Sequence, residues 1–246
     1  MKKRVIKFRL DTLSDFSNRK LVEKVLYYLM ELPRAFRPRK YGTYEPLRSR
    51  ITNGEIEPLI DGWIGVDDPS LHEEFRNTVF FMDTASQGSY MVVWGSNGFS
   101  TLSGRFSFPA RDIEQSASLL LEEVDHLACL LSPEYGYVHD PSSRGGRIPY
   151  DLTVRLPDIP PISILGPKYI EFFGDQRLEQ APYLVVSKRS YGYWLEASES
   201  IFDDVSDNRR KAIREFLGED CFMAIPKQRY KKGRAPNFHP CQEKQS

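Results

Sequence analysis

The sequence has few cysteines and no long apolar run, and these absences exclude two classes of protein. Three cysteines, Cys129, Cys221 and Cys241, are spread irregularly over 246 residues, so they do not form the paired framework of a disulfide-stapled secreted protein. No stretch approaches the roughly 18 consecutive apolar residues of a membrane span. The opening "MKKRVIKFRLDTLSDF" is basic, but charged residues interrupt the apolar core that a signal peptide needs. We expect a soluble, cytoplasmic protein that does not associate with membranes.

Recognisable catalytic and metal-binding motifs are missing as well. There is no G-x-S-x-G elbow, and "GSNGFS" lacks the helix and the lysine that follow a phosphate-binding loop. His126 and Cys129 lie three residues apart, but a structural zinc site needs four ligands, and we expect Cys129 to be a small core residue. We therefore predict no enzyme activity, no metal and no cofactor. The alternative is an enzyme whose active site is assembled from residues distant in sequence, without a recognisable motif.

Aromatic residues are plentiful, and charge is unevenly distributed. Fifteen Phe, thirteen Tyr and three Trp supply bulky core material, and a chain of this length can bury a self-sufficient core. The net charge is zero, yet residues 1–50 hold 14 Lys/Arg against 5 Asp/Glu, residues 51–225 hold 14 against 28, and residues 226–246 hold 6 against 1. Such asymmetry is a hint about binding partners. The alternative is that acidic and basic surfaces of one globule neutralise each other.

The first part of the chain has the pattern of a strand and a helix. Alternating residues in "KKRVIKFRL" predict an opening strand with one buried face. An apolar stripe predicts that a helix follows, with Ser14 or Ser17 as its N-cap and Pro33 as its end. Residues 33–62 contain several Pro and Gly, so we expect a long irregular segment with one strand around "PLRSRIT".

The middle of the chain predicts a meander followed by a helix. Three runs rich in Val, Phe, Tyr and Trp, "TVFFMDT", "SYMVVWGS" and "FSTLSGRFSF", are separated by turns that contain glycine. An unbroken apolar stripe at helical spacing runs from Ile113 to Leu131, and prolines flank it on both sides. "YGYVHD" then has the composition of a further strand.

The remainder predicts a second, smaller unit. Residues 141–161 are rich in Pro and Gly and form the best candidate connection. Beyond it we expect a strand at "ISIL", a short helix, a hairpin, and a helix at 207–217. The predicted fold class is α+β, an antiparallel meander packed against amphipathic helices in two similar halves. The predicted units are a larger half at 1–140, the connection, a smaller half at 162–226, and a basic flexible tail at 227–246.

Two charged segments are candidates for contact with a partner. "RPRKYGTYEPLRSR" (37–50) surrounds Tyr41 and Tyr44 with positive charges; it is a fold-defining turn, a partner contact, or a phosphate-binding hook. "GVDDPSLHEEF" (65–75) gathers four carboxylates close after Trp63, and its alternative interpretation is a solvated loop. The basic end of the chain adds Arg, Lys and aromatic residues that can contact nucleic acid.

Several segments resemble those of bacterial polymorphic-toxin immunity proteins. "WGSNGFSTLSGRFSFP", the amphipathic helix after it and "LLSPEYGYV" are similar to the meander, helix and P-x-x-G-x-V stretch of the immunity protein 52 family. "YGTYEPLRSR" upstream, and "PPISILGPKYIEFFG" with "YLVVSKRSYGYWLEASESIFDD" downstream, resemble other parts of such proteins. Type VI secretion immunity proteins with a "GW-x-T-Y" core are the second resemblance. The similar residues span roughly 40–217.

The resemblance implies a cytoplasmic, non-enzymatic protein that neutralises one toxin by tight binding. In this family the toxin is often a nuclease of restriction-endonuclease-like type. A nuclease site is basic or holds a metal, so an acidic surface at residues 51–225 can block it, with aromatic anchors supplying affinity. The alternative is an RNA- or DNA-binding accessory protein that uses residues 37–50 and the tail. The predicted toxin-binding residues are Trp63, Asp67, Asp68, Glu73, Glu74, Tyr41 and Tyr44.

Overall fold

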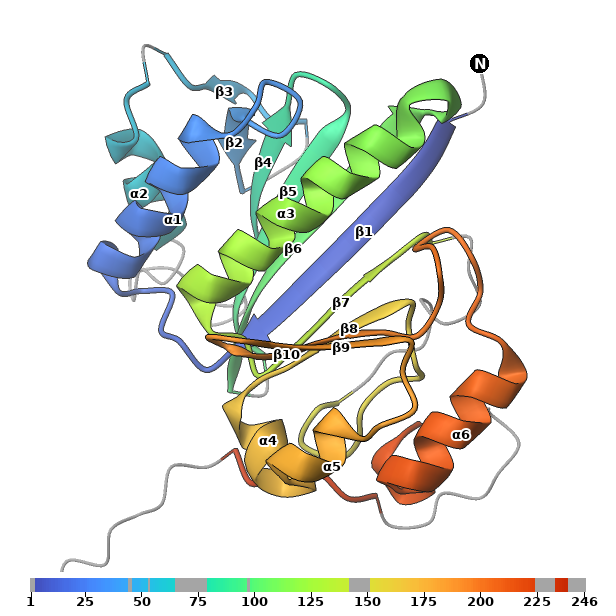
Figure 1. Cartoon of the computed structure of the whole chain (residues 1–246). Helices are drawn as coiled ribbons and strands as arrows, with labels where there is room; N and C mark the ends of the chain where they lie inside the picture. The colour runs from blue at the N-terminus through green and yellow to red at the C-terminus, as the bar shows by residue number, and fades with distance from the viewer. Residues whose placement is uncertain are drawn as a thin grey trace, which may run out of the picture.

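One antiparallel sheet joins both parts of the chain in the computed structural model, which describes residues 3–43, 46–52, 54–64, 79–96, 98–141, 151–223 and 233–238 (Figure 1). The strand order is β3-β2-β4-β5-β6-β1-β7-β8-β10-β9. The strands are β1 (Lys3–Thr12), β2 (Pro38–Gly42), β3 (Ser49–Arg50), β4 (Phe80–Thr84), β5 (Gly88–Ser96), β6 (Phe99–Pro109), β7 (Tyr135–His139), β8 (Ile162–Leu165), β9 (Val185–Arg189) and β10 (Gly192–Glu196).

Helices pack on this sheet, so the predicted α+β class is confirmed. They are α1 (Arg19–Glu31), α2 (Glu57–Ile64), α3 (Ile113–Leu131), α4 (Pro167–Phe173), α5 (Asp175–Glu179) and α6 (Asp207–Leu217). The three strands of the predicted meander are β4, β5 and β6, and the predicted long helix is α3. None of the helices in the described ranges has the length and apolar character needed to cross a lipid bilayer.

The opening strand β1 lies in the middle of the sheet. It pairs with β6 along its whole length, from Lys3 opposite Pro109 to Thr12 opposite Ser100, and with β7 on its other side. Alternate residues of a strand point to opposite faces. Ile6, Phe8 and Leu10 are buried, as the alternation predicted, and pack in the same core as α3.

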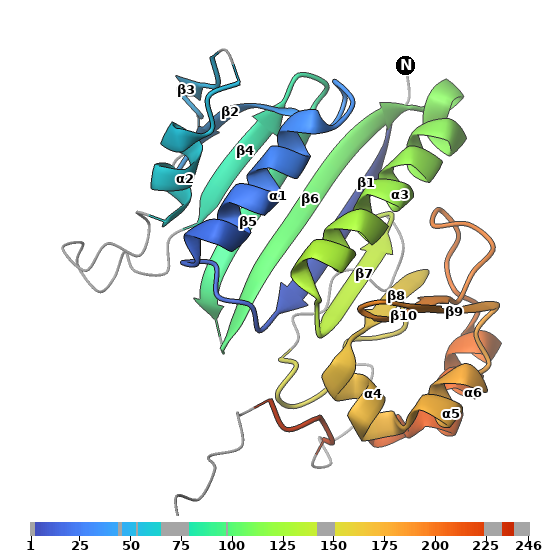
Figure 2. The same ribbon diagram turned by 60° about the vertical axis from the view of Figure 1, so that its left-hand side comes forward.

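The helices cover different faces at the two ends of the sheet (Figures 1 and 2). Side chains of α1 and α3 share one core with Ile164 of β8 and Trp194 of β10. Side chains of α4, α5 and α6 share a second core with the adjacent residues Leu165 and Tyr193. Since neighbouring residues of a strand face opposite ways, the second helix group lies on the other face of the sheet.

Residues 33–62 are more regular than the sequence analysis expected. They contain β3, which lies within the predicted strand "PLRSRIT". They also contain β2 and the first turns of the helix α2, neither of which was predicted. Buried Leu59, Ile60 and Trp63 give α2 one apolar face. Pro58 lies in the first turn, where a missing N–H costs no hydrogen bond. Pro38 and Gly42 lie at the two ends of β2, and Pro58 lies in the first turn of α2, so these residues do not form one continuous loop.

The start of α1 also differs from the prediction. Its N-cap is Asn18, whose side chain accepts a hydrogen bond from the Leu21 amide, and not Ser14 or Ser17. The Ser14 hydroxyl instead donates to the Leu131 carbonyl at the end of α3, at 3.2 Å. Ser14 thus shares with Thr12 a carbonyl at the end of α3 that has no partner within the helix, which sequence spacing alone does not reveal.

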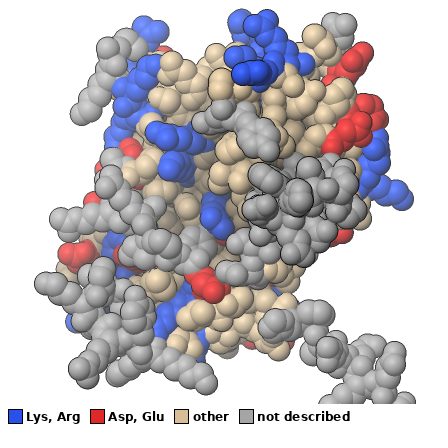
Figure 3. Space-filling model, turned by 180° about the vertical axis from the view of Figure 1, so that it is seen from behind, with Lys and Arg blue, Asp and Glu red and all other residues tan. Residues whose placement is uncertain are grey.

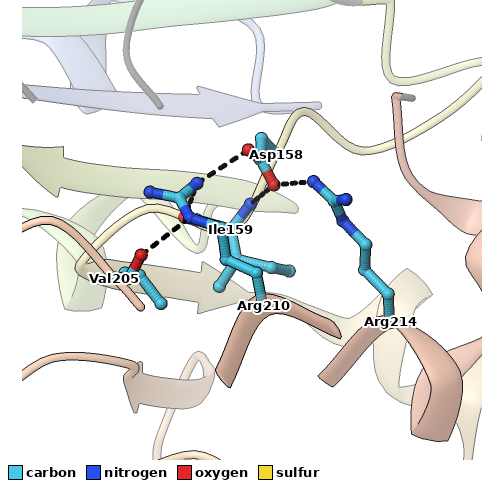
Figure 4. A network of polar contacts seen from close by, with 5 residues as sticks. All are labelled: Asp158, Ile159, Val205, Arg210 and Arg214. Carbon is cyan, nitrogen blue, oxygen red and sulfur yellow. Dashed lines mark hydrogen bonds and ion pairs between the residues drawn. The ribbon is translucent and has the colours of Figure 1, made fainter. Parts of the chain in front are cut away.

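Residues 151–161 of the predicted connection are packed against α6 (Figure 4). Asp158 forms an ion pair with Arg210 at 2.7 Å and a second with Arg214. Arg210 also donates to the carbonyls of Val205 and Ile159, both at 3.0 Å. The division into two halves stays a prediction, and strands from both sides of the connection belong to one sheet.

Part of the predicted flexible tail is described, and it packs on the second core. Arg234 forms an ion pair with Asp220 at 2.6 Å. The Phe238 ring lies 4.9 Å from the Phe99 ring and 5.8 Å from the Tyr169 ring, measured between centroids. For residues 233–238 these contacts differ from the free tail that composition indicated; the rest of 227–246 lies outside the described residues.

Candidate binding face of the sheet

The structure buries Trp63, the aromatic residue predicted to stand beside the acidic segment. Its side chain on α2 has no exposed surface. The ring lies 5.5 Å from Phe16, 6.0 Å from Phe80 and 6.4 Å from Trp94, measured between centroids. A side chain held in this way stabilises α2 against the sheet, and it is closed to a partner protein while this packing holds.

Tyr41 has a similar supporting position at the edge of the sheet. It lies half-buried on β2, with its ring 6.1 Å from the Phe80 ring. This position agrees with the fold-defining interpretation of residues 37–50. The other predicted contact residues lie outside the described residues, so their role stays a prediction: Tyr44, Asp67, Asp68, Glu73 and Glu74.

The described helices leave a broad face of the sheet uncovered. This face belongs to β4, β5, β6 and β1, on the side opposite α1 and α3. Figure 3 views the molecule from that side and shows Lys and Arg side chains over its upper part and near its centre. The face differs from the acidic surface expected for residues 51–225, because strands from residues 1–50 contribute to it.

The strand register places a row of polar side chains across this face. Ser89 of β5 lies opposite Arg105 of β6, Arg105 opposite Lys7 of β1, and Lys7 opposite His139 of β7. Directly opposed residues of neighbouring strands point to the same side, with Cβ atoms about 4.5–5.5 Å apart. Two positive side chains are therefore neighbours at the centre of the sheet.

A second row lies two residues further along the strands. It runs from Phe81 and Met91 through Ser103 and Arg9 to Tyr137. Together with the two cations of the first row, these side chains line an open hollow of about 260 Å³. Ligand pockets for small molecules usually measure about 300–1,000 Å³ and are more enclosed. The hollow therefore fits a protruding side chain better than an enclosed substrate.

The cations of this face differ in how they are neutralised. Arg9 pairs with the buried Asp11 at 2.8 Å, and Asp11 also accepts a hydrogen bond from the Thr101 hydroxyl at 2.6 Å. Lys7 and Arg105 have no carboxylate partner within the described part of the chain. Burial, and then the positive charge of Arg105, lowers the pKa of Lys7. The face thus holds positive charge that its described neighbours do not compensate.

His139 adds no charge to this row at neutral pH. Its side chain is 1% exposed, and burial, followed by the charge of Lys7, lowers its pKa to about 4. Its Nδ1 atom is buried and makes no hydrogen bond to any described group. The imidazole is therefore neutral and extends the row without repelling the two cations further.

Half of this arrangement is visible in the sequence, because the alternation in "KKRVIKFRL" puts Lys7 and Arg9 on one side of the opening strand. Arg105 was not predicted, because nothing in the local pattern of β6 indicates that this residue lies beside Lys7, 98 positions earlier in the chain. The opposed pair is a property of the strand order, which depends on pairing between distant segments.

The described residues offer little for nucleophilic or metal chemistry. Cys129, predicted as a core residue, is exposed on α3, because Ala128 and Leu131 occupy the buried positions around it. Cys221 is buried, and burial raises the pKa of its thiol, which keeps it protonated and unreactive. Within the described ranges, no three His, Cys, Asp or Glu side chains are grouped closely enough to hold a metal ion.

Comparisons with known proteins show similarity in fold. No protein-family model and no curated protein matches the sequence. Among solved structures, Pseudomonas aeruginosa T6SS protein PA0821 is similar with a TM-score of 0.54 and 11% identity, over 96% of this chain and 80% of that chain. At this identity the likeness shows the fold alone.

A second similar structure is the toxic C-terminal tip of CdiA from Pseudomonas aeruginosa in complex with immune protein. It has a TM-score of 0.35 and 13% identity, over 57% of this chain and 88% of that chain. A TM-score this low carries no argument about this chain. The resemblance to the immunity protein 52 family therefore stays a prediction.

Proposed function

We propose that this chain is an immunity protein that binds a cognate bacterial toxin and blocks its activity without catalysis. The observation that carries the proposal is the sheet face that the described helices leave uncovered, where rigid strands present Arg, Tyr and Met around an open hollow. Side chains of this kind, held on rigid elements, are the anchors of protein interfaces. The fold likeness to a protein described as a T6SS protein, and the sequence resemblance to immunity proteins, support the same function.

Co-expression tests this proposal directly. The chain would be expressed with the secreted effector encoded beside its gene, in a host that the effector alone kills. We expect growth to be restored, and the two purified proteins to form a complex in gel filtration. An effector that stays toxic beside folded, soluble chain would overturn the proposal.

The finer proposal is that the toxin is a nuclease of restriction-endonuclease-like type and that the acidic segment at 65–75 occupies its basic cleft. This segment belongs to the part of the chain, 51–225, with 14 Lys/Arg against 28 Asp/Glu. A site that grips phosphate is basic or holds a metal ion, so carboxylates can block it and speed the encounter.

Charge reversal tests the acidic segment. Replacing Asp67, Asp68, Glu73 and Glu74 with Lys is expected to weaken toxin binding by about tenfold or more and to reduce protection, mainly through slower association. The matched control reverses four exposed glutamates elsewhere in the chain and should retain protection: Glu31, Glu55, Glu114 and Glu122. Equal protection by both quadruple variants would show that the segment does not contact the toxin.

The basic strands favour a second candidate, an accessory protein that binds RNA or DNA. Exposed Arg39, Lys40 and Arg50 lie on β2 and β3, at the edge of the same sheet. Phosphate contacts make affinity fall steeply with salt. A gel-shift titration with single-stranded and duplex oligonucleotides, at low and at physiological salt, tests this. Binding that is salt-dependent and stronger than that of an unrelated protein of similar charge is expected only for this candidate.

A further inference from the structure

We propose that the hollow beside Lys7 and Arg105 receives an acidic side chain of the cognate toxin, so that the uncovered sheet face is itself a toxin-binding surface. This inference rests on the proposed function and deepens it, because it names the surface and the chemistry of the partner. It concerns other residues than the acidic segment at 65–75, and those residues carry the opposite charge. A toxin with a basic cleft and an acidic neighbouring surface would meet both, which fixes the orientation of the complex.

The sheet holds two cations side by side at a cost in stability. Lys7 and Arg105 are directly opposed in neighbouring central strands. Like charges in this relation destabilise a sheet, and the lowered pKa of Lys7 reflects both burial and the neighbouring guanidinium. Arg9, two residues further along β1, is neutralised by Asp11. Arg9 therefore has an acidic partner on its own strand, whereas Lys7 has none among the described residues.

The other described ionisable groups near the pair do not neutralise it. His139, opposite Lys7, is neutral at physiological pH because burial and Lys7 lower its pKa to about 4. Asp83 of β4 lies opposite Ser89, one strand further from Arg105, and has its own interactions. Neither group pairs with the two cations, so among the described residues nothing neutralises the positive charge that an incoming carboxylate would meet at the hollow.

Apolar and aromatic side chains border the same hollow. Phe81 and Met91 lie on one side and Tyr137 on the other. Apolar surroundings exclude water and so strengthen an ion pair at their centre, as in the ring of contacts around interface hot spots. Arg and a carboxylate can add a bidentate hydrogen bond. These features fit one protruding Asp or Glu with its flanking apolar residues.

The geometry favours an acidic protein surface over nucleic acid. A strand of nucleic acid presents phosphates at regular spacing and is usually followed by a line of cations with stacking aromatics. Here two cations are concentrated at one hollow of about 260 Å³. The next row along the strands continues with Ser103 and with Arg9, whose charge Asp11 already neutralises. One carboxylate, not a repeating phosphate chain, matches this arrangement.

Two double variants test the inference with the wild-type toxin. Lys7→Glu with Arg105→Glu is expected to weaken binding, measured by calorimetry, at least about 30-fold, the loss that follows from opposing a buried interfacial charge. Lys7→Gln with Arg105→Gln should also bind more weakly, yet unfold at an equal or higher temperature because the repulsion is removed. Lys20→Glu with Lys24→Glu on α1, two exposed lysines on the helix-covered side, is the matched control and should bind like the wild type.

A charge swap supplies a readout that general damage to the fold cannot imitate. In a toxin carrying an Asp→Lys or Glu→Lys change at the contacting position, binding to wild type should fall, and binding to Lys7→Glu with Arg105→Glu should be recovered. Scanning the acidic residues of the toxin in this way identifies the partner group. Recovery by one of them would support a direct contact between opposite charges.

The outcomes distinguish a failure of this inference from a failure of the proposed immunity function. If wild type and Lys7→Glu with Arg105→Glu bind the toxin equally, the sheet face is not the interface, while the immunity function stands. If the wild type neither binds nor protects, both are overturned. A third outcome is that an oligonucleotide binds this face, that the toxin does not displace it, and that Lys7→Glu with Arg105→Glu abolishes its binding. The partner would then be a nucleic acid, and the proposed acidic protein contact would be wrong.

Discussion

Single side chains on the open sheet face affect one another because the register places them in contact distance. Lys7 lies between Arg105 and His139, and its positive charge adds to burial in lowering the pKa of the imidazole. The sequence contains only four histidines, and none had a predicted role. The structure gives His139 a specific property, a buried neutral ring, that its position in "YGYVHD" does not reveal.

This buried imidazole predicts a pH dependence of stability. Between the ordinary pKa of 6.5 and the folded value of about 4, the unfolded chain binds a proton that the folded chain does not. The free energy of unfolding should therefore fall as the pH drops through this window. The full contribution is on the order of 3 kcal/mol, from 1.36 kcal/mol per pKa unit.

Urea unfolding at several pH values checks this prediction. His139→Gln lacks the titrating group, so its free energy of unfolding should decrease less steeply than that of the wild type as the pH drops below 6.5. Carboxylates titrate equally in both proteins and cancel in the comparison. Parallel pH profiles for the two proteins would mean that the imidazole is accessible to protons in the folded state.

Secondary-structure elements were largely predictable where their patterns are local. The apolar stripe and flanking prolines located α3, and the alternation of "KKRVIKFRL" located β1. Helix ends were less predictable. Three polar residues near the start of α1 are good N-caps by type, and the structure uses Asn18 for α1 and Ser14 for the end of α3. Which helix a hydroxyl serves depends on the packing of elements distant in sequence.

Capping by Asn18 predicts a measurable loss on substitution. Asn18→Ala removes the acceptor for the Leu21 amide and should lower the free energy of unfolding by about 1 kcal/mol. Asn18→Ser retains a capping oxygen and should lose only a small part of this. Ser17→Ala is the control at the residue that sequence spacing favoured, since its hydroxyl bonds to Asp15 in an exposed turn. Chemical denaturation that shows the larger loss for Ser17→Ala would contradict this assignment.

At the scale of the whole molecule, contacts between distant segments unite the two ends of the chain. The central strand β1 joins strands on both sides, and Arg4 at its beginning pairs with Asp140 at 3.1 Å while its guanidinium lies 4.3 Å from the Phe202 ring centroid. Arg210 of α6 donates hydrogen bonds to the Asp158 carboxylate and to the Ile159 carbonyl. These contacts hold the α4–α6 group on the sheet face opposite the one that α1 and α3 cover.

The Arg210 network predicts a large effect of one substitution. Arg210 is 7% exposed, and Arg210→Met leaves Asp158 with Arg214 alone and two carbonyls without their donor. Breaking a buried pair in this way should cost about 3–5 kcal/mol. Lys211→Met, one residue further on the exposed side of α6, is the matched control and should change stability little. Thermal unfolding of both variants gives the comparison, and equal melting temperatures would show that the network contributes little.

The sequence by itself determined the α+β class, most strands and the long helices, because alternation, apolar stripes and turn residues act within a few positions. It also contained the chemistry of Lys7 and Arg105 as single residues. Only the tertiary structure decided that they are neighbours, that Trp63 is buried, and that the two helix groups cover opposite faces. Strand order and register arise from pairing between segments up to about a hundred residues apart, and no local pattern specifies that pairing.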